Sequence, residues 1–143
     1  MSRGGRELAL HLLYQMEVRS ETLDQVLPEA LEFLTPEPAA RAFAVRLVEF
    51  SLELRDHTEE LLKETAKNWD PSRFALIDRC LLRLAVAELS RFPESPTNQI
   101  LDQFIELAKS YSTESSGRFV NGVLDPIARK VRASALSPKG EKQ

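Results

Sequence analysis

Two histidines, His11 and His57, and one cysteine, Cys80, are the residues of this 143-residue chain best suited to act as a base, a nucleophile or a metal ligand. Glu53 precedes His57 by four residues, a spacing that can place a carboxylate and an imidazole on one face of a helix. A carboxylate-rich metal site in a helical bundle needs paired copies of such a motif, and the sequence holds no second copy. It also has no phosphate-cradling glycine loop and no nucleophile-elbow pattern. We therefore predict no enzymatic activity, no metal site and no cofactor.

Each of these residues also has an ordinary structural interpretation. The histidines lie in or beside apolar helical stripes, where a packed or capping histidine is common. Cys80 lies among large aliphatic residues and is expected in the core. A single cysteine cannot form an internal disulfide, so a reducing, cytoplasmic setting is expected. The apolar stretch after Arg3 and Arg6 is short and interrupted, so we predict neither a signal peptide nor a membrane span.

The run from Phe119 to Asp125 reads Phe-Val-Asn-Gly-Val-Leu-Asp and contains two residues that an apolar stripe does not explain. Asn121 and Gly122 stand side by side in its middle, although glycine costs about 1 kcal/mol relative to alanine inside a helix. We therefore expect another helix or a ligand to approach this backbone closely. The remaining residues recur at helical spacing and predict a buried face, made of Phe119, Val120, Val123, Leu124, Ile127 and Val131.

Charge is distributed unevenly along the chain, whose net charge is −3. Residues 21–64 contain eleven acidic and four basic side chains, whereas residues 109–132 contain five basic and two acidic ones. A basic segment on an acidic protein can form a local phosphate-binding patch. The same charges can also be scattered over a solvated face, and composition alone leaves both interpretations open.

The positioning elements are predicted to be helices throughout. No segment shows sustained apolar–polar alternation, so we expect an all-α fold with six to seven helices and no strand. Pro28 is expected to begin or kink the second helix, and Asp70 and Thr97 are expected to cap later ones. The expected helices cover residues 6–19, 23–34, a long stretch from about 43 towards 67, 71–91, 97–108, and a last one from the polar turn at 112–116 to about 133.

Four blocks of this sequence occur together in the NusB family of transcription antitermination factors. Besides the run from Phe119 to Asp125, they are Glu106-Leu-Ala-Lys109, Arg6-Glu7 followed by Ala9-Leu10 and Leu13-Tyr14, and Asp78 to Ala85 followed by Glu88-Leu89. Because the blocks keep the family's order across residues 6–131, the chain resembles NusB proteins over nearly its whole length. The resemblance implies two small helical bundles packed side by side, with the break at residues 69–71 as their seam. Residues 1–133 then form a single domain, and residues 134–143 are expected to be a disordered tail.

The resemblance also implies binding of single-stranded boxA-type RNA. The family's arginine-rich start corresponds here to Arg3 and Arg6, and a family aromatic corresponds to Tyr14, whose ring can stack on an unpaired base. With only two arginines, the RNA affinity is expected to be modest and steeply salt-dependent. The structural alternatives are a frayed terminus for the two arginines and burial for Tyr14. Charge and hydrogen-bonding capacity add three further RNA-binding candidates, Lys109, Arg118 and Asn121, the last of which can instead tie the neighbouring bundle.

A second surface is implied for NusE, the ribosomal protein that pairs with NusB. Four charged residues of the middle helix occupy the matching positions, Asp78, Arg79, Arg83 and Glu88. Charges at this spacing can equally form ion pairs on a solvated helix face. Arg83 is the residue best placed for a structural role, because aliphatic residues flank it on both sides.

The sequence thus predicts a non-enzymatic antitermination factor that joins NusE on RNA and supports the transcription elongation complex on ribosomal RNA operons. Two alternatives remain. A NusB-like domain also opens certain RNA cytosine methyltransferases, but the chain has no room for their cofactor-binding domain. The other alternative is a helical protein-interaction or oligomeric module, for example a homodimer, with weak or no RNA binding.

Overall fold

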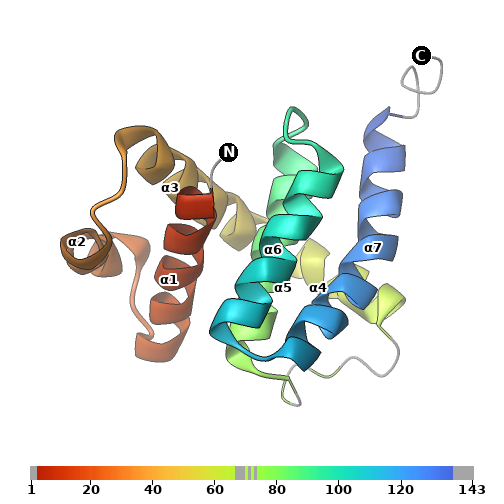
Figure 1. The fold of residues 1–143 in the computed structure, drawn as a ribbon, viewed down its shortest axis with the longest axis horizontal. Coiled ribbons are helices and arrows are strands. Elements are labelled where there is room, and N and C mark those ends of the chain that lie inside the picture. The colour runs from red at the N-terminus through yellow and green to blue at the C-terminus, as the bar shows by residue number, and fades with distance from the viewer. Residues whose placement is uncertain (1–2, 67–69, 71, 73, 137–143) are drawn as a thin grey trace.

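Seven helices make up the part of the chain that the computed structural model describes, which is residues 3–66, 70, 72 and 74–136 without the side chains of Arg3 and of residues 134–136 (Figure 1). No strand occurs among these residues, so the predicted all-α fold with six to seven helices is confirmed. None of these helices is long and apolar enough to span a membrane. In chain order, the helices are α1 (Arg3–Arg19), α2 (Leu23–Leu34), α3 (Pro38–Glu53), α4 (Arg55–Thr65), α5 (Leu76–Arg91), α6 (Thr97–Tyr111) and α7 (Glu114–Leu136).

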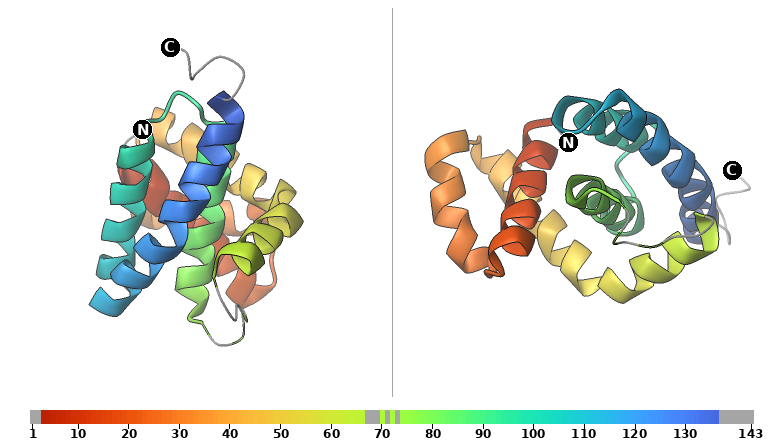
Figure 2. Two further views of the ribbon diagram at one scale, coloured as in Figure 1. Left: turned by 90° about the vertical axis from the view of Figure 1, so that its right-hand side faces the viewer. Right: turned by 90° about the horizontal axis from the view of Figure 1, so that it is seen from below.

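Helix α5 lies in the middle of the fold, where other helices surround it (Figure 2). Ten of its 16 residues are buried, including a continuous run from Leu84 to Leu89. A helix that is buried around most of its circumference needs neighbours on every side. Helices α1 and α3 pack against it from one half of the molecule, and α6 and α7 pack from the other half. The two small helical bundles predicted above therefore share α5 at their junction.

Helix α2 has the bounds that the sequence predicted, and its start shows why. The hydroxyl of Thr22 accepts a hydrogen bond from the backbone N–H of Gln25 at 3.3 Å, and the Gln25 side chain accepts one from the Thr22 N–H at 2.8 Å. This reciprocal capping box fixes the first turn. Pro28 lies inside the helix, so it does not begin the helix as one alternative had proposed. Thr35 ends the helix with a positive φ of 35°.

The long amphipathic stretch predicted towards residue 67 is divided in two. Helix α3 ends at Glu53, Leu54 has φ −93° and ψ 10°, and α4 begins at Arg55. The apolar spacing continues through this point, so periodicity could not reveal the break. Its consequence is that α4 changes direction and packs against α7.

The start of α5 also differs from its prediction. Asp70 does cap a turn, because its Oδ1 accepts hydrogen bonds from the Ser72 backbone N–H at 3.1 Å and from the Ser72 hydroxyl at 2.8 Å. The helix nevertheless begins only at Leu76. Thr97 is the first residue of α6 and makes no side-chain cap. Apart from Asp70, the expected seam at residues 69–71 lies outside the described residues.

Close packing occurs at Gly5 and Gly117, and not at Gly122, the glycine that the sequence analysis singled out. A Cβ atom on Gly122 would meet nothing within 4 Å, so no other helix approaches the backbone there. A Cβ atom on Gly5 would lie 2.7 Å from the Phe43 ring, so Gly5 lets α1 pass close to α3. The Phe43 ring in turn meets the edge of Phe92 at a centroid distance of 5.0 Å. The expected approach of a helix to Gly122 was wrong, and the alternative, a ligand at this backbone, stays a prediction.

The stripe of the last helix is in the core as predicted. Leu124 has no exposed surface and Val123 is 5% exposed. Helix α7 continues to Leu136, so the first residues of the expected disordered tail are helical. Residues 137–143 lie outside the described part of the chain.

Candidate nucleic-acid interface

Arg6 lies in the interior, between α1 and α5, where it forms an ion pair with Glu88. Its Nε atom donates to Glu88 Oε1 at 2.7 Å and its Nη2 atom donates to Oε2 at 2.5 Å, and neither side chain has any exposed surface. A guanidinium without exposed surface cannot contact RNA, and a buried carboxylate cannot contact a partner. The predictions of Arg6 as an RNA-binding residue and of Glu88 as a partner-binding residue were therefore wrong. The apolar neighbours of Glu88, such as Ala87 and Leu89, were the available signal.

Asp78 is also buried, with 6% of its surface exposed. Its Oδ2 atom accepts a hydrogen bond from the Ser116 hydroxyl at 3.0 Å, which ties the start of α5 to the start of α7. The Thr113 hydroxyl caps α7 by accepting from the Ser116 backbone N–H at 3.0 Å. The prediction of an exposed, partner-binding carboxylate at position 78 was wrong, because this side chain positions two helix starts instead.

Tyr14 lines a pocket of about 300 Å³ between α1 and the adjoining ends of α2, α5 and α6. Tyr111, at the end of α6, also lines the pocket, and its hydroxyl donates a hydrogen bond to Glu7 Oε2. Sequence analysis missed Glu7 and Tyr111 as site residues, since they are 104 positions apart. Tyr14 is partly buried against the core and also faces the pocket. The described residues that line it are Glu7, Leu10, His11, Tyr14, Gln15, Leu34, Ile77 and Tyr111.

Two of the predicted RNA-binding cations lie together where α6 ends and α7 begins, at the lower end of the molecule in Figure 1. The Lys109 chain runs over Gly117, where an added Cβ would come within 2.8 Å of Lys109 Cγ. Gly117 directly precedes Arg118, which is exposed. Lys109 Nζ lies 3.9 Å from Glu106 Oε2, and the Lys109 side chain is 39% exposed. The lack of a side chain at Gly117 thus lets Lys109 pack next to the start of α7.

Asn121 is exposed one turn beyond Arg118. It forms no hydrogen bond with any other described residue, so the alternative that it ties the neighbouring bundle finds no support in the described part of the chain. With Gly122 also exposed beside it, this face of α7 presents an amide group and bare backbone. The Arg3 side chain, the remaining RNA candidate, lies outside the described atoms.

Arg132, in the rest of the basic segment, serves the fold. Arg132 donates to three backbone carbonyls at the end of α5 and in the following turn, those of Leu89 at 3.0 Å, Phe92 at 3.2 Å and Ser95 at 3.0 Å. Arg129 pairs with Asp125 at 2.6 Å, and Lys130 pairs with Glu64. Both of these ion pairs are exposed, so Arg132 is the one basic residue that the structure removes from the patch suggested by the charge count.

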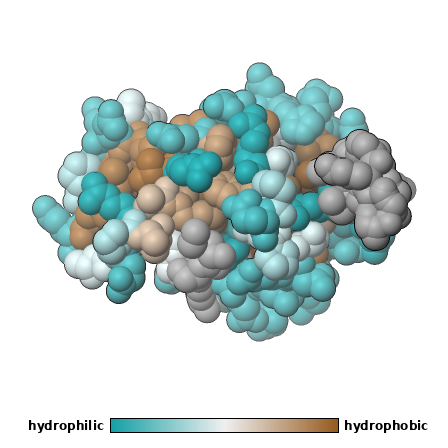
Figure 3. Space-filling model, turned by 90° about the horizontal axis from the view of Figure 1, so that it is seen from above, coloured by the Kyte–Doolittle hydropathy of each residue, from teal (hydrophilic) through white to brown (hydrophobic). Residues whose placement is uncertain are grey.

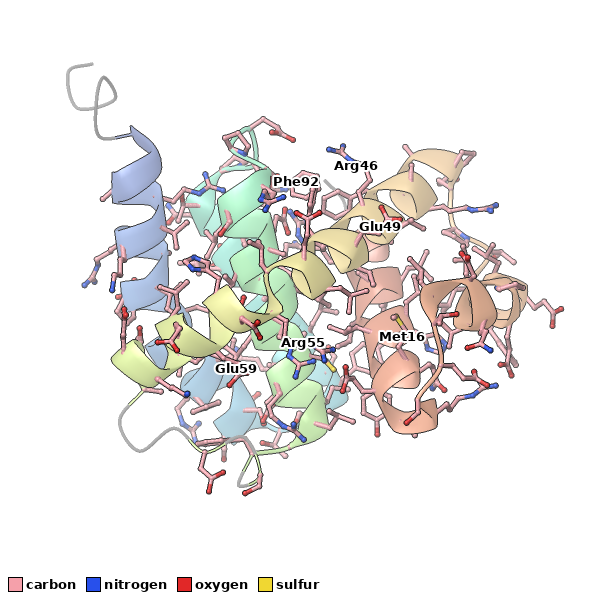
Figure 4. The ribbon with its side chains drawn as sticks, turned by 180° about the vertical axis from the view of Figure 1, so that it is seen from behind. Met16, Arg46, Glu49, Arg55, Glu59 and Phe92 are labelled. Atoms are coloured by element: carbon pink, nitrogen blue, oxygen red, sulfur yellow. The ribbon has the colours of Figure 1, made fainter. Side chains whose placement is uncertain are left out.

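A second group of charges surrounds Glu17 at the junction of α1, α4 and α5, the side that Figure 4 shows with Arg55 and Met16 labelled. Glu17 Oε2 accepts from Arg55 at 2.8 Å and from Arg83 at 3.2 Å, and the two arginine side chains are 46% and 12% exposed. Arg79 is partly exposed one turn before Arg83. The Nε atoms of Arg79 and Arg83 are buried without a hydrogen-bond partner among the described residues. We call Arg55, Arg79, Arg83 and Glu17 the arginine cluster.

Cys80 lies beneath this cluster and is fully buried. Burial raises the pKa of its thiol to about 12. A thiol with such a pKa is protonated near neutrality and is a poor nucleophile. Cys80 is the core residue that the sequence predicted.

The described surfaces offer positive charge, aromatic rings and hydrogen-bonding groups, which can hold a ligand without making or breaking its bonds. An all-helical fold that presents them defines a binding protein. The chain belongs to the NusB family, because the model of that family matches residues 3–129. Members of the family are transcription antitermination factors and not enzymes.

Curated relatives cover most of the chain. The transcription antitermination protein NusB of Salinibacter ruber is 40% identical over 126 residues, which are 87% of this chain and 79% of the relative. The protein of the same name from Sorangium cellulosum is 39% identical over 127 residues, which are 89% of this chain and 91% of the relative. The predicted family is therefore confirmed.

Solved structures agree with this assignment. NusB of T. maritima matches with a TM-score of 0.81 at 36% identity, covering 91% of this chain and 92% of that one. A chain in the crystal structure of antitermination factors NusB and NusE in complex with dsRNA matches with a TM-score of 0.80 at 28% identity, covering 90% of this chain and 96% of that one.

Proposed function

We propose that this chain binds boxA-type single-stranded RNA together with NusE and thereby promotes processive transcription of ribosomal RNA operons. The observation that carries the proposal is the placement of two exposed cations, Lys109 and Arg118, at the same end of α6 as the pocket of Tyr14 and Tyr111. A relative of known structure is in complex with NusE and dsRNA, which supports NusE and RNA as partners. The protein acts in the cytoplasm, as part of the transcription elongation complex.

The RNA surface combines two kinds of contact. Lys109 and Arg118 bind phosphates, and Arg3 adds a third cation at the chain start. Tyr14 stacks on an unpaired base, which is the usual way in which proteins bind single-stranded RNA. Asn121 donates to and accepts from a base edge or the backbone.

The arginine cluster is the surface for NusE. Of the four residues assigned to it from the sequence, Arg79 and Arg83 remain accessible. We add Arg55 and Glu17 because Glu17 pairs with both Arg55 and Arg83. Two of its three arginines, Arg55 and Arg83, pair with the single carboxylate of Glu17, so the cluster has an excess of positive charge on an acidic protein.

Assembly links the two surfaces. Each is small and holds its ligand weakly alone. When NusE itself also contacts the RNA, the second contact becomes intramolecular and the whole complex binds more tightly than either pair.

A titration of boxA-type RNA with and without NusE, repeated over a range of salt concentrations, tests the proposal. Since Arg6 is buried, three cations remain for phosphate binding, and log affinity against log salt should have a slope of about −2 for single strands. NusE should raise the apparent affinity at every salt concentration. Absence of RNA binding even with NusE present would contradict the proposal.

The second candidate function is an oligomeric or protein-interaction module without RNA binding. It is favoured by exposed hydrophobic surface over α2 and α3, visible from above in Figure 3. Phe33 is 73% exposed, and an apolar cleft of about 570 Å³ opens between these helices beside Leu27 and Val45. Sedimentation over a concentration series distinguishes the candidates, because a module of this kind self-associates through Phe33 while failing to bind RNA.

A further inference from the structure

Among the described residues that line the pocket of Tyr14, one carries a formal charge when histidine is counted as neutral, and that charge is negative. Glu7 is the only carboxylate among these described lining residues, which include one histidine, His11, but no lysine or arginine. A phosphate would therefore be repelled from the pocket, although Lys109 and Arg118 at the adjacent end of α6 attract phosphates. If RNA binds as proposed above, its backbone follows the cations and its base side faces Glu7.

The dimensions and the walls of the pocket fit one base. Its volume of about 300 Å³ is at the lower end of the range for small-molecule sites. Two tyrosines, Tyr14 and Tyr111, and the apolar side chains of Leu10, Leu34 and Ile77 supply surfaces against which a flat ring can pack. Longer ligands would extend out of it.

The Glu7 carboxylate is held in place by a neighbour. The Tyr111 hydroxyl donates to its Oε2 atom, which fixes the side chain. Among the described residues, Oε1 and a second lone pair of Oε2 have no other hydrogen-bond donor and can accept from a ligand. A carboxylate only accepts hydrogen bonds, so it selects a base edge that carries donors. Guanine has two adjacent donors, N1–H and the N2 amine, on its Watson–Crick edge. On that edge, the donor of each other base is flanked by an acceptor, which a carboxylate would repel.

We propose that this pocket binds one unpaired guanine, whose Watson–Crick edge donates two hydrogen bonds to Glu7, with Tyr111 as the residue that positions the carboxylate. The inference rests on the proposed RNA function and adds base selection to it. The residues that bind phosphates set the affinity, whereas Glu7 and Tyr111 set the preference for guanine.

The test uses a short oligouridine with one central guanine, compared with the same strand carrying inosine, which lacks only the N2 amine. Binding is measured in the presence of NusE for the wild-type protein and for Glu7→Gln. The wild type should bind the guanine strand roughly fivefold to a hundredfold more tightly than the inosine strand, the range expected for a bidentate contact. Glu7→Gln should lose most of this preference, since an amide offers one acceptor and one donor group.

Two further variants keep the result interpretable. Tyr111→Phe removes a single hydroxyl, and it should reduce the guanine preference while leaving the salt slope unchanged. Arg118→Ala should weaken both strands equally and leave the preference intact. Equal binding of guanine and inosine strands by the wild type, with RNA binding and its salt slope otherwise present, would overturn the inference but not the proposed function. Loss of all RNA binding by the wild type would instead refute the proposed function and the inference with it.

Discussion

The ion pair of Arg6 and Glu88 gives the most direct test of how the structure reassigns a residue that sequence placed on the RNA surface. Both side chains are fully buried and joined by two charge-assisted hydrogen bonds of 2.7 and 2.5 Å. Removal of one member leaves the other as an uncompensated buried charge, which costs about 3 to 5 kcal/mol. Arg6→Met and Glu88→Gln should each lower the free energy of unfolding by this amount. That is a large part of the roughly 5 to 15 kcal/mol that stabilises a typical domain.

The assay is urea denaturation followed by circular dichroism at constant pH. With a slope of about 2 kcal/mol per molar urea, a loss of this size lowers the midpoint by about 1.5 to 2.5 M. The double variant Arg6→Met/Glu88→Leu supplies the control. It removes both charges and keeps the volume apolar, so it should recover much of the stability that each single variant loses.

Two outcomes would refute the reasoning. One is a loss of unfolding free energy below about 1 kcal/mol in either single variant, because removal of a solvent-exposed ion pair causes a loss of that size. The other is a double variant whose loss equals the sum of the single losses, because independent sites add and a true pair does not. If Arg6 bound RNA instead, Arg6→Met would leave stability unchanged and make the salt slope of RNA binding shallower by nearly one unit.

Five other predictions each concern a single side chain. Arg118→Ala should make the salt slope of RNA binding shallower by nearly one unit. Tyr14→Ala should instead lower RNA affinity by about 1 to 3 kcal/mol at an unchanged slope, because stacking releases no counterions. RNA titrations over a series of salt concentrations test both predictions. Arg83→Ala should weaken NusE binding in calorimetry, and unchanged affinity in a folded variant would move the interface elsewhere. Leu124→Ala removes a buried side chain and should lower the free energy of unfolding, measured in urea, by about 2 to 5 kcal/mol. A loss near zero would show that the truncation leaves no cavity in the core. The pKa of Cys80 is raised from 9.0 to about 12. Above pH 9 the unfolded chain therefore loses a proton that the folded chain keeps, and the free energy of unfolding should fall as pH rises. A thiol reagent at neutral pH should label Cys80 only after unfolding.

Helices were predictable because their signals are local. The bounds of α2 follow from apolar spacing and from the capping box of Thr22 and Gln25, all within one segment. The break at Leu54 has no such signal, since the apolar stripe continues through it. Asp70 shows the complementary failure, because an aspartate can cap a short turn as well as a helix, and here it caps the turn to Ser72. The sequence around Asp70 therefore indicated a side-chain cap correctly, but it did not indicate that the cap closes a turn and that α5 begins later.

The charged residues were misassigned for a different reason. Arg6 is 82 positions from Glu88, and Asp78 is 38 positions from Ser116. Whether such a side chain is buried depends on a partner that only the folded chain brings near. A family match transfers the position of a residue but not its exposure. Asp78→Lys, which would be harmless on a solvated face, is therefore expected to destabilise this protein.

These buried carboxylates still act on the RNA surface through the helices that they join. The Arg6–Glu88 pair fixes the rotation of α1 against α5, and the next residue, Glu7, then faces the pocket and Tyr111. Successive side chains on a helix point about 100° apart, so α1 cannot turn Glu7 away without removing Arg6 from its partner. The Asp78–Ser116 bond likewise ties the start of α5 to the start of α7, two residues before Arg118. Arg6, Asp78 and Glu88 were expected to contact RNA or NusE directly. Instead, they hold in position residues such as Glu7 and Arg118, which we propose make contact with RNA.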